Sequence, residues 1–345
     1  MTRAGGGGRN RCCAALLLLA QIAASGAAAE VIDLSGEHGY DPVVLRDLGP
    51  GSVIDARSAM FRPANSRNTN PSAEAGCEIG PLPVNAYPLR IYRAPAALLI
   101  GGTFDGEVPQ ASDWEHSYCN SAAIAIFDSP RMIVERARVR RAWDGARFSG
   151  ASDFLVLGRS WFSEIRDDCL ENDFLNDGLV EDVLFDGCFS GISMRQLPSR
   201  AADGSARTLT LLGALIRVTS YPYRGEMRTG PPIKAGAASP RLRVIDSVFA
   251  MEGNAIVSRS QLAAGWERIS DCRGNLFLWM SDRPWPPGFK RPPSCFRFVQ
   301  GPEARALWRE VRDNWIGCHP NMRRFEDDPA PETAECDALS YGRQY

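Results

Sequence analysis

The sequence predicts an all-β protein: a right-handed, single-stranded parallel β-helix in which each repeat forms one coil of a solenoid. First, three apolar segments within residues 131–191 each lead to an acidic or glycine-rich turn. Second, their central valines, Val134, Val156 and Val180, recur at intervals of 22 and 24 residues, and a period in the low twenties is typical of solenoids. Third, no segment there carries a 3.6-residue apolar stripe long enough for a helical repeat. We expect the valines to stack inside the coils.

The N-terminus has the pattern of a signal peptide. Three arginines precede a short leucine-rich stretch within residues 14–24, and small residues end at Ala29. We therefore predict that residues 1–29 are removed and that the protein is exported to the periplasm or the cell exterior. The apolar stretch is too short to span a bilayer.

Residues 30–97 are predicted to form an N-terminal cap and the first coil, because they include a long Asn, Pro, Ser and Gly-rich stretch and a β-helix needs its open end covered. Residues 98–320 are predicted to form the parallel β-helix and residues 321–345 a C-terminal cap or tail. Among the later strands we expect 266–269 and 307–311. Long loops at 220–240 and 283–293 are expected on one face, where solenoids often bind ligands.

Composition limits the partners. The formal net charge is −2 and the basic residues are dispersed, whereas nucleic-acid binding normally needs a basic face. We therefore expect a glycan partner, no nucleic acid, no membrane span and a monomer.

The predicted mature chain keeps eight of the ten cysteines, and an even number in an exported protein indicates disulfides. We predict Cys169–Cys188 and Cys272–Cys295, whose spacings are about one coil. We also predict Cys77–Cys119 and Cys318–Cys336. A zinc site is disfavoured because there is no Cys-x-x-Cys and the three histidines are scattered.

Acidic residues form the main functional pattern. Asp167 and Asp168 follow Asp144 by 23 and 24 residues, so coil stacking should bring the three carboxyls to one corner. One such acid alone is more often a solvated turn residue. Three together raise at least one pKa, which suits a general acid beside a general base. We expect an exposed groove walled by residues 107–120 and 220–240. Asp167 and Asp168 can share its side only at a strand end or bulge.

Four segments, in order, resemble the motifs of polygalacturonases and related β-helix glycoside hydrolases. They are Gly-Gly-Thr-Phe-Asp-Gly (101–106), Trp-Asp-Gly-Ala-Arg-Phe-Ser (143–149), Ser-Glu-Ile-Arg-Asp-Asp-Cys-Leu (163–170) and Cys-Phe-Ser-Gly-Ile-Ser (188–193). The resemblance covers about residues 98–240. It implies that Asp167 protonates the glycosidic oxygen, while Asp144 and Asp168 activate water and cause inversion. It also places the Cys169–Cys188 disulfide beside the site.

The same resemblance implies a substrate-binding set. Lys234 lies where the family has Arg-Ile-Lys and would hold a substrate carboxylate. Pro232 replaces the arginine of that motif, with Arg228 the nearest substitute, and Ser190 stands near the place of the family's histidine.

Tryptophans could stack on sugar faces, and Trp114, Trp143 and Trp161 are the candidates. Packing between coils or under loops is the alternative, and it is favoured for Trp161.

Three functional classes remain open. The first is a polysaccharide hydrolase that inverts and needs no metal or other cofactor, with Asp144 and Asp167 offset to the roughly 6.5–9.5 Å that such a pair requires. The second is a uronic-acid lyase or epimerase, with calcium at the acidic corner and Arg147, Arg166 or Lys234 as base. The third is a non-catalytic β-helix that binds glycan or an envelope surface.

Overall fold

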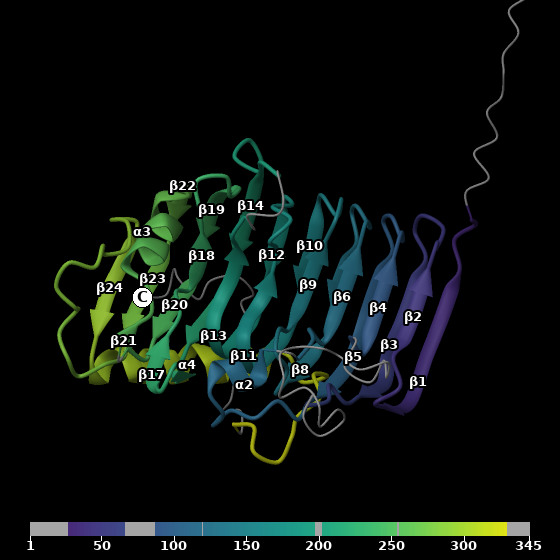
Figure 1. Cartoon of the computed structure of the whole chain (residues 1–345), viewed down its shortest axis with the longest axis horizontal. Coiled ribbons are helices and arrows are strands. Elements are labelled where there is room, and N and C mark those ends of the chain that lie inside the picture. Colours follow the sequence, from purple (N-terminus) through teal and green to yellow (C-terminus); the bar gives the residue numbers. More distant parts are fainter. Residues whose placement is uncertain (1–26, 66–86, 119, 197–201, 254, 330–345) are drawn as a thin grey trace, which may run out of the picture.

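The computed structural model describes residues 27–65, 87–118, 120–196, 202–253 and 255–329. Its parallel strands wrap nearly 310° round a common axis and stack as successive coils (Figure 1). The predicted parallel β-helix is confirmed. The predicted signal peptide falls largely outside the described residues.

Each coil contributes strands to up to three faces, which we call the first, second and third sheets. The first sheet contains the opening halves of β1 (Val31–Gly39), β3 (Val53–Phe61) and β5 (Leu98–Asp105), then β7 (Ile133–Glu135), β10 (Leu155–Gly158), β12 (Gly178–Glu181), β14 (Thr208–Leu212), β19 (Arg241–Ile245) and β22 (Ile269–Arg273). Described residues of the segment 30–97 thus already belong to stacked coils.

The second sheet contains the later halves of β1, β3 and β5, then β8 (Arg138–Arg140), the opening halves of β11 (Trp161–Glu171) and β13 (Leu184–Met194), β15 (Leu215–Val218), β20 (Val248–Met251), β23 (Asn275–Trp279) and β24 (Phe296–Gln300). The third contains β2 (Val43–Arg46), β4 (Leu89–Tyr92), β6 (Ile124–Phe127), β9 (Ala146–Ser149), the later halves of β11 and β13, and β18 (Ile233–Ala235).

The remaining elements lie outside these faces. A hairpin of β16 (Tyr221–Tyr223) and β17 (Glu226–Thr229) pairs with β21 (Ala255–Ile256) in a small separate sheet. Among the described residues, the helices are α2 (Trp114–Ser117), α3 (Arg259–Glu267) and α4 (Pro302–Cys318).

The predicted alignment of valines is wrong by one residue. Val134 pairs with Leu157, and Leu157 pairs with Val180, so the repeat is 23 residues at both steps. These three side chains are fully buried, whereas Val156 points to the outer face and is half-buried. Because side chains alternate along a strand, a slip of one residue moves the whole strand to the opposite face. The chosen valines therefore predicted the coil but not its register.

Polar ladders close the corners between sheets. The hydroxyl of Ser129 accepts from the backbone N–H of Ala94 at 3.0 Å, and the hydroxyl of Ser152 accepts from the N–H of Ser129 at 3.1 Å. One coil further, the amide oxygen of Asn176 accepts from the N–H of Ser152 at 3.1 Å. Buried backbone donors that leave the strand ladder are thus satisfied.

Two predicted strands are wrong in whole or part. Residues 307–311 lie in α4, whose buried Ala304, Trp308, Val311 and Trp315 recur at helical spacing. The residue Trp266 belongs to α3, and β22 begins only at residue 269. The helix α4 packs on the outer face of the second sheet and covers Trp161, whose ring centroid lies 6.4 Å from that of Trp315.

Two predicted disulfides are confirmed. Cys169 on β11 and Cys188 on β13 are bonded across adjacent coils with a Cα–Cα distance of 5.7 Å, and Cys272–Cys295 has a distance of 5.9 Å. Bonds of this kind are typical of oxidising, extracytoplasmic compartments. Both other predicted pairings include cysteines outside the described residues and stay predictions. Among the helices of the described ranges, none is long and apolar enough to cross a membrane.

Candidate functional site

A β-bulge in β11 places two consecutive acids at one corner of the coil. Ile165 pairs with Cys188 and Asp168 with Ser190, so β11 holds one more residue than β13 over this span. The extra residue breaks the alternation of the strand, and both Asp167 and Asp168 line the same cavity. The predicted requirement for a bulge is met.

Asp144 joins them from the coil before, between β8 and β9. Its Oδ1 accepts from the backbone N–H of Asp168 at 3.2 Å, and the N–H of Gly145 donates to the carbonyl of Asp168 at 3.1 Å. Only glycine fits at 145, since a Cβ there would lie 2.5 Å from the carbonyl oxygen of Cys169. One carboxylate oxygen from each of the three aspartates lies within 4.8 Å of the others. The structure therefore brings the three predicted acids together.

The three aspartates are buried rather than exposed as expected. The exposed fraction is 0% for Asp144, 9% for Asp167 and 2% for Asp168. Burial is tolerated because a cation reaches the cluster: Nζ of Lys234 on β18 lies 2.7 Å from Asp168 and 3.9 Å from Asp167. Lys234, which was predicted to hold a substrate carboxylate, thus already pairs with two carboxylates of the protein.

A second cation, Arg147, and a fourth acid, Glu171, complete the charge network. Sequence reasoning predicted Arg147 only as a possible base of a lyase or epimerase and gave Glu171 no role in the site. Arg147 on β9 donates to Oδ2 of Asp144 at 2.9 Å and to the hydroxyl of Tyr87 at 2.8 Å, and it also pairs with Glu171 at the end of β11. Arg147 and Glu171 lie on neighbouring coils, where Glu171 pairs in register with Arg147. The available signal was this one-coil spacing of opposite charges.

The charge network gives the acids different pKa values. Burial, and then repulsion from Glu171, raises the pKa of Asp144 to about 8. Burial also raises the pKa of Asp167, where attraction by Lys234 limits the rise to about 6. Burial and the charge of Asp167 raise the pKa of Asp168. Since Lys234 keeps its proton, its ammonium stabilises one negative charge on the Asp167–Asp168 pair, and burial favours a single shared proton on that pair.

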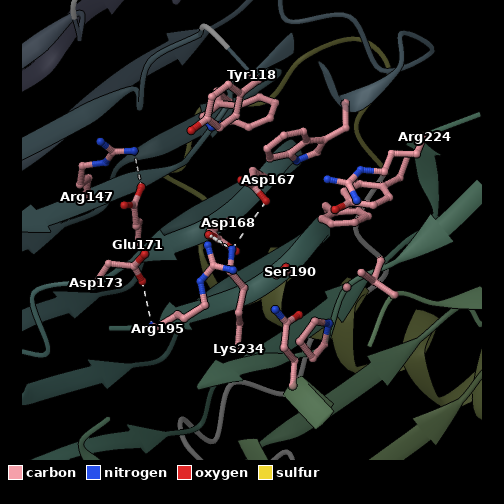
Figure 2. Close-up of a pocket in the computed structure, with 18 residues that line it drawn as sticks. Tyr118, Arg147, Asp167, Asp168, Glu171, Asp173, Ser190, Arg195, Arg224 and Lys234 are labelled. Carbon is pink, nitrogen blue, oxygen red and sulfur yellow. Dashed lines mark hydrogen bonds and ion pairs between the residues drawn. The ribbon is translucent and has the colours of Figure 1, made fainter. Parts of the chain in front are cut away.

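Asp167 and Asp168, with Glu171 and Asp173, line the floor of a cavity of about 430 Å³. Figure 2 shows Asp167, Asp168, Ser190 and Lys234 near its centre, with Glu171 and Asp173 to one side and Arg224 to the other. The side chain of Asp144 lies beneath this floor and is not part of its lining. Ser190 contributes a buried hydroxyl that has no hydrogen-bond partner among the described residues.

Aromatic rings line the same cavity as the acids. Trp114 lies 5.4 Å from Trp143, 4.6 Å from Tyr118 and 5.7 Å from Tyr223, measured between ring centroids. Tyr223 in turn stacks on Phe189 at 5.5 Å. These rings form an aromatic wall that comes from the segments 107–120 and 220–240, as predicted, together with the start of the β8–β9 turn and β13.

The two wall segments are tied together behind the cavity. Arg166 is fully buried and donates to the carbonyl of Ser112 at 3.0 Å and to that of Pro222. The carboxylate of Asp113 accepts from the N–H groups of Arg224 and Gly225 at 3.0 and 2.7 Å.

The predicted ligand Arg228 lies elsewhere, and Trp161 packs under a helix, as the favoured interpretation of this residue had it. Arg228 pairs with Glu226 and lines a separate hollow beside α3. The ring of Trp161 is buried under α4.

No protein-family model, curated protein or solved structure matches the chain. The resemblance to polygalacturonases therefore depends on the four motifs.

Proposed function

We propose that the protein is an exported, polysaccharide-active β-helix enzyme that hydrolyses glycosidic bonds by acid–base catalysis. The observation that carries this proposal is the pair of cavity-lining carboxyls on the β11 bulge, which share one ammonium and line the same cavity as the aromatic wall. Acids in such environments titrate near neutral pH, and aromatic faces suit sugar rings.

Asp167 is the proposed general acid. It lines the cavity, and its pKa of about 6 leaves a useful fraction protonated in mildly acidic or neutral solution. Asp168 is the proposed partner that accepts a proton from water. The ammonium of Lys234 donates to its Oδ2 at 2.7 Å and opposes the rise in pKa that burial and Asp167 cause, and its Oδ1 is buried without a hydrogen-bond partner among the described residues. The Ser190 hydroxyl, beside it on the next coil, would hold a sugar hydroxyl or the water.

Asp144 is assigned a supporting role instead of water activation. Its side chain does not line the cavity, and a pKa of about 8 keeps it mostly neutral at pH 7. Its contacts to Arg147 and to the N–H of Asp168 hold β9 and the bulge in register.

The spacing of the acids constrains where water can bind. The nearest oxygens of the cluster lie within 4.8 Å, below the roughly 6.5–9.5 Å of carboxyl pairs that hold a water between them. Inversion, the outcome implied by the family resemblance, would therefore require the water to bind beside the Asp167–Asp168 pair.

A lyase or epimerase is supported less well. Lys234 and Arg147 have pKa values raised by the neighbouring carboxylates, so neither is suited to lose a proton as a base. Arg166 is buried behind the wall, where it bonds to backbone carbonyls. A calcium ion at the three aspartates would have to displace the ammonium of Lys234.

A glycan-binding protein without turnover is the second candidate. The aromatic wall would bind sugars whether or not a reaction follows. The ion pair between Lys234 and Asp168 already occupies the ammonium and the carboxylate on which the proposed hydrolysis depends.

The test is a screen of the purified chain on acidic and neutral polysaccharides, with reducing ends and unsaturated products measured together. Reducing ends without unsaturation support the hydrolase, and unsaturated ends support the lyase. Binding without either product supports the second candidate.

A further inference from the structure

A second cavity, of about 260 Å³, lies at the corner between the first and second sheets. Its walls come from the turn within β3, the turn within β5, the β7–β8 corner and the segment after α4. It shares no lining residue with the site of the three aspartates.

The lining of this cavity is strongly basic. Arg57, Arg136, Arg138 and Arg323 line it, and no aspartate or glutamate does. Neutral hydrogen-bonding groups come from Ser58, Thr103 and Asn321. A concave site with several guanidinium groups and hydroxyls favours an anion with several oxygens.

Two of the four arginines have acidic partners and two do not. Arg57 pairs with Asp55, and Arg138 pairs with Asp328 at 2.8 Å. Within the described part of the chain, neither Arg136 nor Arg323 forms an ion pair. The cavity therefore holds an excess of positive charge.

Arg138 is the fixed part of the site. It is 1% exposed, and its Nη1 donates to the carbonyl of Val139 and to the hydroxyl of Ser163 at 2.8 and 3.0 Å. Its Nε is buried and lacks a hydrogen-bond partner among the described residues. Burial lowers the pKa of Arg138 to about 10, although its ion pair with Asp328 acts in the opposite direction. A desolvated guanidinium in basic surroundings favours a nearby anion.

The first family-like motif accounts for the shape of this corner. Gly101 has a φ of +83°, and a Cβ there would lie 2.6 Å from the Cα of Arg57. Glycine thus lets the coils approach closely at the turn, which places Arg57 beside Thr103 and the β7–β8 corner. The glycines of residues 101–102 consequently serve the basic cavity, at a distance in the fold from the aspartate cluster.

We propose that this basic cavity binds a tetrahedral oxyanion, a phosphate or sulfate group that is either free or esterified to a glycan. Arg136 and Arg323 would supply charge from the rim. Arg138 would supply a buried donor, and the hydroxyls of Ser58 and Thr103 would complete the oxygen contacts.

The test is isothermal titration of the purified chain with inorganic phosphate, inorganic sulfate and glucose 6-phosphate, at constant ionic strength in chloride. The Arg136→Gln/Arg323→Gln variant is compared with an Arg241→Gln/Arg309→Gln variant, which removes two exposed arginines elsewhere. We expect the first variant to lose affinity by about tenfold or more and the second to bind like the wild type.

Comparing the three titrated ligands distinguishes a free oxyanion from one that is esterified to a glycan. Tighter binding of glucose 6-phosphate than of inorganic phosphate would assign the site to an esterified glycan, and the reverse order to the free ion. The proposal is overturned if the wild type binds none of the three more tightly than chloride, or if both double variants bind alike. Neither result depends on the hydrolase assignment, because none of the substituted arginines lines the aspartate cavity.

Discussion

The Nζ of Lys234 lies 2.7 Å from Oδ2 of Asp168 in the cavity on the outer face of the coils, where the Lys234 side chain is 12% exposed. The ammonium also lies 3.9 Å from Oδ1 of Asp167, so one cation balances two carboxyls on the same bulge. This relationship links the stability of the β-helix to the protonation of its candidate site.

Removing this cation should destabilise the protein. In Lys234→Met the carboxyls would remain buried without their counter-charge, and breaking such a pair costs about 3–5 kcal/mol in the free energy of unfolding. Lys290→Met is the matched control, because Lys290 and Glu267 form an exposed pair of a kind worth about 0–1 kcal/mol. Denaturant unfolding of both variants measures the difference, and equal losses would contradict the buried pairing.

Stability should fall as pH rises from about 4 to 8. The pKa of Asp144 is raised to about 8 and that of Asp167 to about 6, against about 3.9 when unfolded. Because the folded state holds these protons more tightly, their contribution is complete below pH 4 and is lost as the pH passes the folded values. Asp144→Asn should flatten the curve of unfolding free energy against pH. The exposed Asp41→Asn should leave it unchanged. A steep curve in both variants would reject the assignment of Asp144.

The disulfide beside the site should matter more for binding than its counterpart. Each encloses a loop of about one coil, so Cys169→Ala/Cys188→Ala and Cys272→Ala/Cys295→Ala should each lower the unfolding free energy by about 3 kcal/mol. Only the first bond joins β11 to β13 directly behind the bulge. We expect glycan affinity to fall in the first variant alone, and a fall in the second variant of the same size would show that the effect is global.

The aromatic wall should bind sugar rings. Trp114→Ala would remove the ring that contacts three others at the cavity, with a loss of about 0.5–1.5 kcal/mol in glycan binding. Trp161→Phe is the control, since this ring lies under α4 and should affect stability only. Affinity measured on immobilised polysaccharide checks both, and unchanged binding in Trp114→Ala would exclude this wall as a sugar platform.

Much of the fold follows from the spacing of apolar residues, whereas register does not. The interval between Val134 and Val180 is two true coils, but only pairing with Leu157 fixes which residue of the middle strand faces inward. The short apolar run at 307–311 predicts a strand, whereas the seven-residue spacing of Trp308 and Trp315 is that of the buried face of α4.

Part of the candidate site could also be predicted from the spacing of residues along the coils. Coil spacing brought Asp144 to Asp167 and Asp168, because stacking acts on the backbone. Coil spacing also relates Arg147 to Glu171. Spacing could not show that Arg147 also bonds Asp144, that Lys234 turns to Asp168, or that Arg228 turns to Glu226. Those contacts depend on side-chain direction and on which loop folds over the groove.

The central claim is that Asp167 is the general acid of a polysaccharide hydrolase, and the rate of reducing-end release by Asp167→Asn tests it most directly. On any polysaccharide that the wild type cleaves, the rate should fall by about 10²–10⁴-fold, while glycan binding stays intact and the exposed control Asp271→Asn keeps the wild-type rate. An Asp167→Asn variant that cleaves as fast as the wild type would contradict the account.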